Sequence, residues 1–265
     1  MRAAFFQTSP IFGKSEANVE KVLAKIHSID AHLIVLPEFF NTGYQFKSKS
    51  EVFQLVEEVP KGWATQRLIE AAKKKRLFIV AGLAERYCSR FYNSSILVGP
   101  KGFIGIYRKM HLFWNEKRFF TIGNTPFKVY NIGTARIGMM ICFDWLFPEA
   151  VRVLALKGAD IICHPSNLVL PHCPQAMITR CLENRVFAIT ANRIGIEKRI
   201  KGQKLKFIDQ SEIVAPNGRI LCRASDNKEK IGIAEIDPRT AQNKSITPLN
   251  NIFKDRMKKF YKPLI

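Results

Sequence analysis

Short apolar runs alternate with amphipathic helical patterns along the whole chain, and this alternation constrains the fold more than any other feature. Apolar runs of about four to eight residues are typical of buried strands, whereas an apolar residue at every third or fourth position is typical of a helix packed on a sheet. The sequence therefore predicts an α/β fold. The expected strands span 3–7, 33–36, 77–84, 94–98, 102–108, 136–142, 160–163, 187–191, 212–215 and 219–222, and the expected helices span 15–28, 62–75, 148–156 and 174–183.

The chain is long enough to bury one large core. It has 265 residues, of which 47% are hydrophobic, and no low-complexity linker or break in composition divides it. We expect one domain over residues 1–265 with a C-terminal extension from about residue 250. The chain lacks a run of about 18 apolar residues, and its first residues do not form a secretion signal. We therefore expect a cytoplasmic protein with reduced cysteines and no membrane span.

The formal net charge of +20 is unusually high, and the basic residues cluster at 73–76, 198–206 and 254–262. A basic surface attracts nucleic acid or anionic membranes through a non-specific electrostatic term. None of these clusters alternates with aromatic residues as a base-stacking surface would. We interpret the charge as a solvated surface and expect no nucleic-acid or membrane partner.

Three reactive residues each follow an apolar strand, where the loops of an α/β fold form clefts. Burial would raise the pKa of the Glu38 carboxyl toward the range of a general base. Lys109 ends the expected hairpin, where an ammonium could hold an oxyanion and lower the pKa of a thiol. Cys142 lies just before a helix, with free backbone amides after it. Each residue alone also has a structural interpretation, as a loop acid, a surface charge and a buried cysteine.

Two other kinds of site find less support. The chain has no Gly-x-Ser-x-Gly motif for a serine hydrolase. The pairs Cys163–His164 and His172–Cys173 offer zinc-ligating side chains, but their spacing is that of neither a finger nor a ribbon. We therefore expect no metal site.

Together, the motifs around these residues resemble those of the nitrilase, or carbon-nitrogen hydrolase, superfamily. Residues 36–43, 107–112 and 141–149 resemble its glutamate, lysine and cysteine motifs, in that order. Residues 115–120 resemble the stretch with the family's second glutamate, here Glu116, and 164–167, 183–185 and 211–218 extend the similarity over nearly the whole chain. The sequence is most similar to a compact branch of aliphatic nitrilases and amidases from thermophiles.

This resemblance implies a four-layer α-β-β-α sandwich that forms a homodimer, with the C-terminal extension at the dimer interface. It also implies that Glu38, Lys109 and Cys142 form a catalytic triad, that Glu116 positions the substrate or Lys109, and that no cofactor is needed. Cys142 would attack an amide, carbamoyl or nitrile carbon and form a thioester. Lys109 and the backbone amide of Phe143 would hold the oxyanion. Asp144 better fits a capping role than proton transfer.

The residues around the triad suggest a small neutral substrate. Relatives that act on N-carbamoyl D-amino acids carry two arginines soon after the cysteine, whereas this chain has Trp145 and Leu146, which cannot grip a carboxylate. We expect the pocket to be lined by the residues Phe39, Tyr44, Phe113, Trp114, Phe143, Trp145 and Asn167. An amide or N-carbamoyl compound is the first expectation, because most branches of the superfamily cleave these, and an aliphatic nitrile is the alternative.

Two alternatives from other classes stay open. The net charge alone supports a non-enzymatic basic module that binds RNA or an acidic partner, although such a scaffold would be expected to have lost one of its catalytic residues. A cysteine peptidase would need a Cys–His pair. His111 and His164 are available, but neither lies in the sequence that surrounds that family's histidine.

Overall fold

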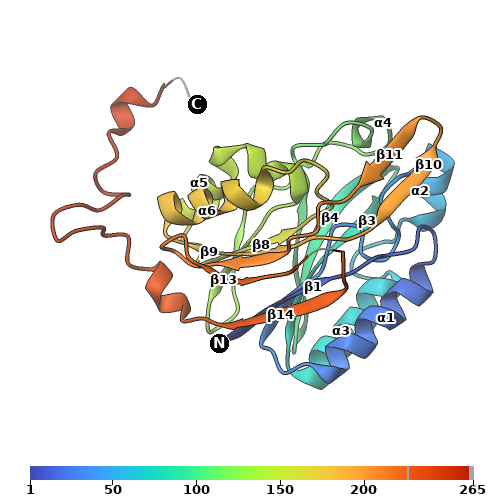
Figure 1. Ribbon diagram of the computed structural model, residues 1–265, viewed down its shortest axis with the longest axis horizontal. Coiled ribbons are helices and arrows are strands. Elements are labelled where there is room, and N and C mark those ends of the chain that lie inside the picture. The colour runs from blue at the N-terminus through green and yellow to red at the C-terminus, as the bar shows by residue number, and fades with distance from the viewer. Residues whose placement is uncertain (226, 263–265) are drawn as a thin grey trace.

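Two mixed sheets pack face to face, and a pair of helices covers the outer face of each (Figure 1). The computed structural model describes residues 1–225 and 227–262. The layers follow the order α-β-β-α, so the expected sandwich is confirmed.

The first sheet has the strand order β14-β1-β2-β3-β4-β5. The first three strands in the chain run parallel to one another, and the others join antiparallel. Helices α1 and α3 pack on its outer face. The bounds are β1 Arg2–Gln7, β2 Leu33–Val35, β3 Phe78–Tyr87, β4 Arg90–Gly99, β5 Gly102–Arg108, β14 Lys230–Glu235, α1 Ser15–Ser28 and α3 Trp63–Lys75.

The second sheet has the order β13-β12-β9-β8-β7-β6, with β7, β8 and β9 parallel. Helices α5 and α6 cover its outer face. The bounds are β6 Val129–Asn131, β7 Arg136–Met139, β8 Ile161–Pro165, β9 Phe187–Ala191, β12 Glu212–Val214, β13 Ile220–Arg223, α5 Pro148–Leu156 and α6 Cys173–Asn184.

Alternation along the central strands divides the core in two. In β1, Ala3 and Phe5 join the large cluster that includes the space between the sheets, whereas Ala4 and Phe6 join the cluster under α1 and α3. Successive strand residues point to opposite faces, so a strand buried on both sides is apolar throughout. This is why the short apolar runs were reliable signals for these strands.

Several elements were not expected from the sequence. They are α2 Lys49–Leu55, α4 Glu116–Phe119, the hairpin of β10 Ile196–Ile200 and β11 Gln203–Lys206, the strands β6 and β14, and the 3₁₀ helices η1 Cys142–Leu146, η2 Pro238–Ala241 and η3 Lys258–Phe260. Most are short or polar, so apolar periodicity carries little signal for them. The expected strand 136–142 also proved too long, because β7 ends at Met139 and Cys142 begins a tight turn.

Beyond η2 the chain leaves the sandwich and extends away from it, as Figure 1 shows at the left. The expected C-terminal extension lies in this segment, and its residues 263–265 fall outside the described part of the chain. In the described part of the chain, every helix is too short or too polar to cross a membrane.

Candidate active site

The four residues singled out in the sequence, Glu38, Lys109, Glu116 and Cys142, come together from four different elements. Glu38 follows β2, Lys109 follows β5, Glu116 begins α4 and Cys142 begins η1. All four side chains are buried. Glu38 and Lys109 follow strands of the first sheet, and Cys142 follows β7 of the second sheet. The site therefore lies between the two sheets, at one end of the sandwich.

Lys109 links the two carboxylates. Its Nζ lies 2.7 Å from Glu38 Oε1 and 2.9 Å from Glu116 Oε2. Burial lowers the pKa of Lys109, but the charges of Glu116 and Glu38 outweigh it, so the net pKa lies above its usual value. The ammonium therefore stays protonated. Its Nζ also donates to Glu116 Oε1 at 2.9 Å, so the ammonium contacts both oxygens of that carboxylate.

Glu38 has one occupied and one free oxygen. Its Oε1 accepts hydrogen bonds from Asn93 Nδ2 and Lys109 Nζ, both at 2.7 Å, while the buried Oε2 has no partner among the described residues. Burial raises the pKa of Glu38 to about 6, and Lys109 limits the rise. The carboxyl thus has the raised pKa expected of a general base, with a free oxygen available to take a proton.

Cys142 is held in a left-handed backbone conformation, with φ at 41°. Burial raises the pKa of its thiol well above the usual value, the charge of Glu38 raises it further, and Lys109 lowers it by less. Lys109 lowers the pKa of the thiol as expected, but burial and the charge of Glu38 outweigh it. Cys142 is therefore a thiol at rest, and it would need a base to act as a nucleophile.

His164 fixes the turn that carries Cys142. Its Nε2 lies 2.9 Å from the carbonyl oxygen of Cys142, and its Nδ1 lies 3.1 Å from Thr190 Oγ1. Burial lowers the pKa of His164 to about 4, so the ring is neutral near pH 7. Nε2 must carry the proton, because a carbonyl can only accept it. Both ring nitrogens are engaged, and the histidine acts on the backbone of the nucleophile.

Asn93 and Tyr44 complete the surroundings of Glu116. Tyr44 Oη donates to Glu116 Oε1 at 2.7 Å, and Asn93 Nδ2 bonds Glu38 and reaches Glu116 Oε2 at 3.4 Å. Sequence reasoning missed Asn93. The available signal was a polar side chain inside the strand region that precedes Lys109, where burial requires a partner.

Two glycines let neighbouring backbones approach the triad. A Cβ on Gly82 would lie 2.5 Å from Glu38 Cα, and one on Gly123 would lie 2.0 Å from the carbonyl oxygen of Arg108. Neither contact is possible for a real side chain. Gly82 in β3 therefore sets the position of Glu38, and Gly123 sets that of the segment before Lys109.

Asp144 ties the cysteine turn to the lysine loop. Its Oδ2 accepts hydrogen bonds from the backbone N–H of Ile141 and from Tyr107 Oη, both at 2.8 Å, and its Oδ1 lies 2.7 Å from His111 Nδ1. The capping role expected for Asp144 is confirmed.

Comparison with known proteins places this geometry in a family. Residues 2–244 match the family described as carbon-nitrogen hydrolase. The chain belongs to the carbon-nitrogen hydrolase family.

It is 46% identical to a nitrilase from Pyrococcus abyssi over 98% of this chain and 99% of that protein. It is 32% identical to an (R)-stereoselective amidase from a Pseudomonas species over 89% of this chain and 85% of that protein. A crystal structure of a carbon-nitrogen hydrolase from Helicobacter pylori superposes with a TM-score of 0.89 at 28% identity, covering 100% of this chain and 98% of that one. The resemblance to this superfamily is confirmed.

Two hollows open at the triad of this carbon-nitrogen hydrolase. The first, of about 230 Å³, contains Cys142 among mostly apolar side chains, and the second, of about 310 Å³, contains Glu116. The first is lined by the expected residues Phe113, Phe143, Trp145 and Asn167, with Leu168, Val169 and Leu170 in addition. The second is lined by the expected residues Tyr44 and Trp114, with Gln45, Phe46, Asn115, Phe119, Phe120 and Leu205.

Phe39 does not line either hollow. Its side chain is fully buried and packs against Tyr44, Phe46 and Phe120 at ring-centroid distances of 5.2 to 6.1 Å. The structure places Phe39, which was expected to contact substrate, in an aromatic cluster, because the turn after β2 directs it there. Asn167 has a second task, since its Nδ2 donates to the backbone oxygen of Glu38 at 2.8 Å.

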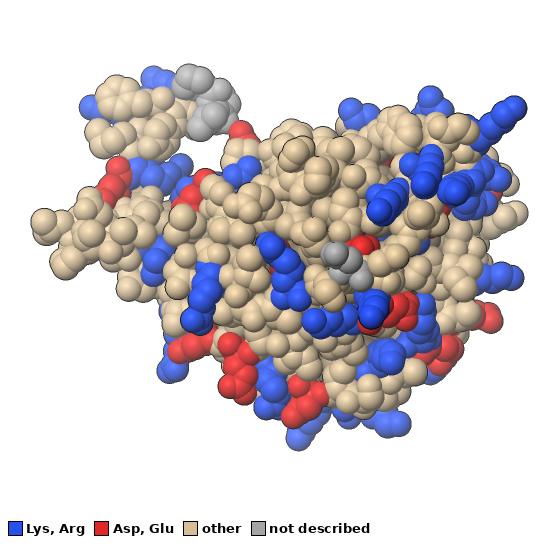
Figure 2. Space-filling view, in the orientation of Figure 1, with Lys and Arg blue, Asp and Glu red and all other residues tan. Residues whose placement is uncertain are grey.

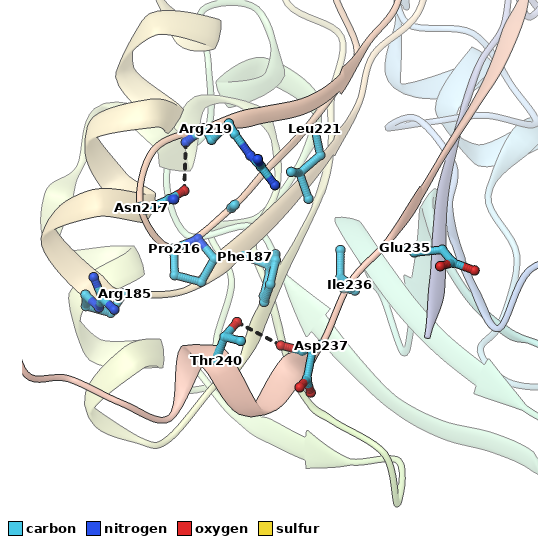
Figure 3. Close-up of a pocket in the computed structure, with 11 residues that line it drawn as sticks. Arg185, Phe187, Pro216, Asn217, Arg219, Leu221, Glu235, Ile236, Asp237 and Thr240 are labelled. Carbon is cyan, nitrogen blue, oxygen red and sulfur yellow. Dashed lines mark hydrogen bonds between the residues drawn. The ribbon is translucent and has the colours of Figure 1, made fainter.

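A larger hollow of about 660 Å³ lies elsewhere on this hydrolase, between the β12–β13 turn and the end of β14 (Figure 3). Its lining includes Arg185, Arg219, Glu235 and Asp237 but no thiol or imidazole. It offers no nucleophile paired with a base, so the smaller hollows at Cys142 and Glu116 are the better site for chemistry.

Proposed function

We propose that this carbon-nitrogen hydrolase cleaves the C–N bond of a small amide or N-carbamoyl compound, releases ammonia and passes through a thioester on Cys142. One observation carries the proposal: Glu38 keeps a buried oxygen that has no partner among the described residues, beside the charged ammonium of Lys109. A base with a free oxygen and a cation for the oxyanion are the two things that a buried thiol needs for acyl transfer.

In the first half of the reaction, Glu38 Oε2 takes the proton of the Cys142 thiol as sulfur bonds to the carbonyl carbon. The carbonyl oxygen becomes an oxyanion, which Lys109 Nζ and the backbone N–H of Phe143 stabilise. Protonated Glu38 then gives its proton to the nitrogen, the C–N bond breaks and ammonia leaves. The raised pKa of Glu38, about 6, suits a group that must take and return a proton.

In the second half, Glu38 takes a proton from water, and the hydroxide attacks the thioester carbon. The second oxyanion is held by the same donors. It collapses with cleavage of the C–S bond, and the proton on Glu38 returns to the sulfur. Glu116 touches neither reacting atom and keeps Lys109 in place through the contact between its carboxylate and Nζ.

A nitrile is the second candidate substrate, and a specific observation favours it. The relative that is 46% identical is named a nitrilase. A nitrile carbon would accept the same thiolate attack and give a thioimidate, which water converts to the same thioester with loss of ammonia. The residues of the site serve both reactions.

The lining of the first hollow supports a small substrate with an apolar chain. Phe113, Phe143 and Trp145 surround Cys142, and Asn167 adds a polar contact. Trp145 is buried and Leu146 faces outward, so no arginine pair grips a carboxylate next to the scissile bond.

The test is ammonia release by the wild type and by Cys142→Ala. The panel holds short aliphatic amides, N-carbamoyl amines and aliphatic nitriles. We expect release by the wild type to vanish in Cys142→Ala and to persist in Cys88→Ala, which removes an exposed thiol in the turn between β3 and β4. Activity that survives in Cys142→Ala would contradict the proposal. Salt-sensitive binding to RNA without any turnover would favour the basic module instead.

A further inference from the structure

The hairpin β10–β11 forms a wall of the active site. Leu205 in β11 lines the hollow that contains Glu116. The neighbouring Gln203 accepts a hydrogen bond through Oε1 from Asn115 Nδ2 at 2.9 Å, and Asn115 directly precedes Glu116. The hairpin is thus attached to the segment that carries a site carboxylate.

Alternation along the hairpin gives it a basic outer face. Leu205 is buried, whereas Lys204 and Lys206 on either side of it are exposed, and in β10 Glu197 is buried next to exposed Lys198. Adjacent strand residues point to opposite faces, so the lysines flank the wall without entering the hollow. Figure 2 shows Lys and Arg side chains gathered at the upper right, where Figure 1 places β10 and β11.

Helix α4 adds to this charge. Glu116 points inward, and Lys117 and Arg118 after it are exposed. We call the set of exposed cations on α4 and the hairpin the basic collar, which consists of Lys117, Arg118, Lys198, Lys201, Lys204 and Lys206.

The acids near the basic collar do not neutralise it. Glu116 pairs with Lys109, Glu197 with Arg193, and Glu51 with Arg199. Among the described residues, no member of the collar is paired with a carboxylate. Six exposed cations on α4 and the hairpin are therefore not balanced by these acids, within a chain of net charge +20.

Unpaired charges of one sign beside a cleft raise the local concentration of ligands of the opposite sign. Such steering changes association rates by about 10 to 10³, and it acts over a screening length of about 8 Å at physiological salt. The first hollow itself is apolar around Cys142. Phe113 lines this hollow, and the next residue, Trp114, lines the second hollow, which Leu205 of the hairpin borders. A substrate chain that runs from Cys142 toward the second hollow would place a charge at its far end near the collar.

We propose that the basic collar makes this enzyme prefer substrates that carry a negative charge at the end remote from the scissile bond. The amide, carbamoyl or nitrile group would reach Cys142, a short methylene chain would occupy the apolar hollow, and a carboxylate would lie near the collar. The inference rests on the proposed function and names its substrate class. It also predicts that amines of the same length are poor substrates, because the collar repels a cation.

The experiment compares three amides of equal length that differ only in the far end: a carboxylate, a methyl group and an ammonium. The corresponding nitriles are run beside them. At low ionic strength we expect kcat/KM for the anionic compound to exceed that for the neutral one about tenfold, and that for the cation to be lowest. The preference should fall to about twofold or less near 0.5 M salt.

Charge reversal tests whether the preference for the anionic substrate arises from the basic collar. Lys204→Glu/Lys206→Glu should remove the preference for the anionic substrate, with the neutral amide as the internal reference. The matched control Lys73→Glu/Lys74→Glu changes the net charge equally at exposed positions in the last turn of α3, outside the collar, and should keep the preference.

The outcomes separate the two proposals. Equal kcat/KM for the three compounds at low salt would contradict the proposed role of the basic collar. An equal loss of the preference for the anionic substrate in both double variants would also contradict it. Either result would leave the proposed function intact. Binding to RNA that depends on Lys204 and Lys206, without any charge preference among substrates, would also contradict the role of the basic collar. No ammonia from any amide, carbamoyl compound or nitrile would contradict the proposed function, and the collar with it.

Discussion

Glu38, Lys109 and Glu116 form a buried cluster with two acids and one base, and this imbalance shapes the chemistry. Burial disfavours both negative charges, and one ammonium cannot fully compensate two carboxylates. The pKa of Glu38 rises to about 6 as a result of burial first and of Glu116 in addition, with Lys109 opposing both. Since the groups interact strongly, the fall in rate at low pH reports an apparent pKa of the whole cluster rather than the pKa of one residue.

The first prediction concerns that fall in rate at low pH. The base must be ionised, so kcat/KM should fall about tenfold per unit as the pH drops below about 6. A pH–rate profile between pH 4.5 and 8.5 measures this. Glu38→Gln should lower kcat/KM by about 10³ at every pH, because an amide cannot accept the thiol proton. A wild-type profile that stays flat to pH 5 would contradict a base in this cluster with a pKa near 6.

The second prediction concerns His164, a positioning residue. His164→Leu leaves the carbonyl of Cys142 unpaired and should lower kcat by about 100-fold with little change in KM, because the thiol turns away from its productive position. His164→Gln keeps an N–H donor and should recover part of the loss. Steady-state kinetics, with thermal unfolding to show that both variants fold, provide the measurement. Equal losses in the two variants would contradict this role.

Among the elements, β12 carries a buried acid that the chemistry does not use. Glu212 Oε2 accepts hydrogen bonds from Arg223 Nε and Nη2 at 2.9 and 2.6 Å, while its Oε1 has no partner among the described residues. Burial raises the pKa of Glu212 to about 7 from 4.5, although Arg223 lowers it. A central strand therefore holds a carboxyl that is more easily protonated in the folded state than in the unfolded one.

The third prediction follows from the sign of that shift. Between pH 4.5 and about 7 the folded chain keeps a proton on Glu212 that the unfolded chain has released, so the free energy of unfolding should fall as the pH rises through this range. Over the whole range, the free energy of unfolding should fall by about 3 kcal/mol. Urea unfolding of the wild type and Glu212→Gln at fixed protein concentration measures it. The difference in stability between the two should change with pH, and a constant difference would rule the effect out.

At the scale of the whole molecule, the segment after η2 carries large apolar side chains that its own chain does not cover. Leu249 is 91% exposed, Phe260 67% and Met257 53%. Lys244 anchors the start of this segment by donating to the backbone oxygens of Asn184 and Arg185 at 3.0 and 2.8 Å. Apolar side chains on an extended segment are typical of an interface. We propose that the protein is a homodimer in which this extension contacts the partner.

The fourth prediction tests that assembly. Sedimentation equilibrium of the wild type should show a dimer, and Leu249→Ser/Phe260→Ser should raise its dissociation constant at least about tenfold, since each exposed side chain would lose about 1.5 to 3 kcal/mol of burial. Ile11→Ser is a suitable control, because Ile11 is 61% exposed on the loop between β1 and α1. A wild type that sediments as a monomer would contradict the proposal.

The sequence by itself determined the class of fold and the bounds of some of the regular elements. The helix at 15–28 and the strand at 187–191 have the predicted ends, because amphipathic and apolar periodicity are local properties of the chain. The positions of Glu38, Lys109 and Cys142 after apolar runs were also readable, since a reactive side chain after an apolar run is a local pattern. The ordered motifs around them led to the family.

Only the tertiary structure decided how these residues meet and what surrounds them. The pairing of β14 with β1, the place of Asn93 between two carboxylates and the bond from His164 to the Cys142 carbonyl all join residues far apart in the chain. Phe39 was expected in the pocket and packs in the core instead, because the turn after β2 sets its direction. Partners, burial and pKa values arise from non-local contacts, which the order of residues along the chain does not display.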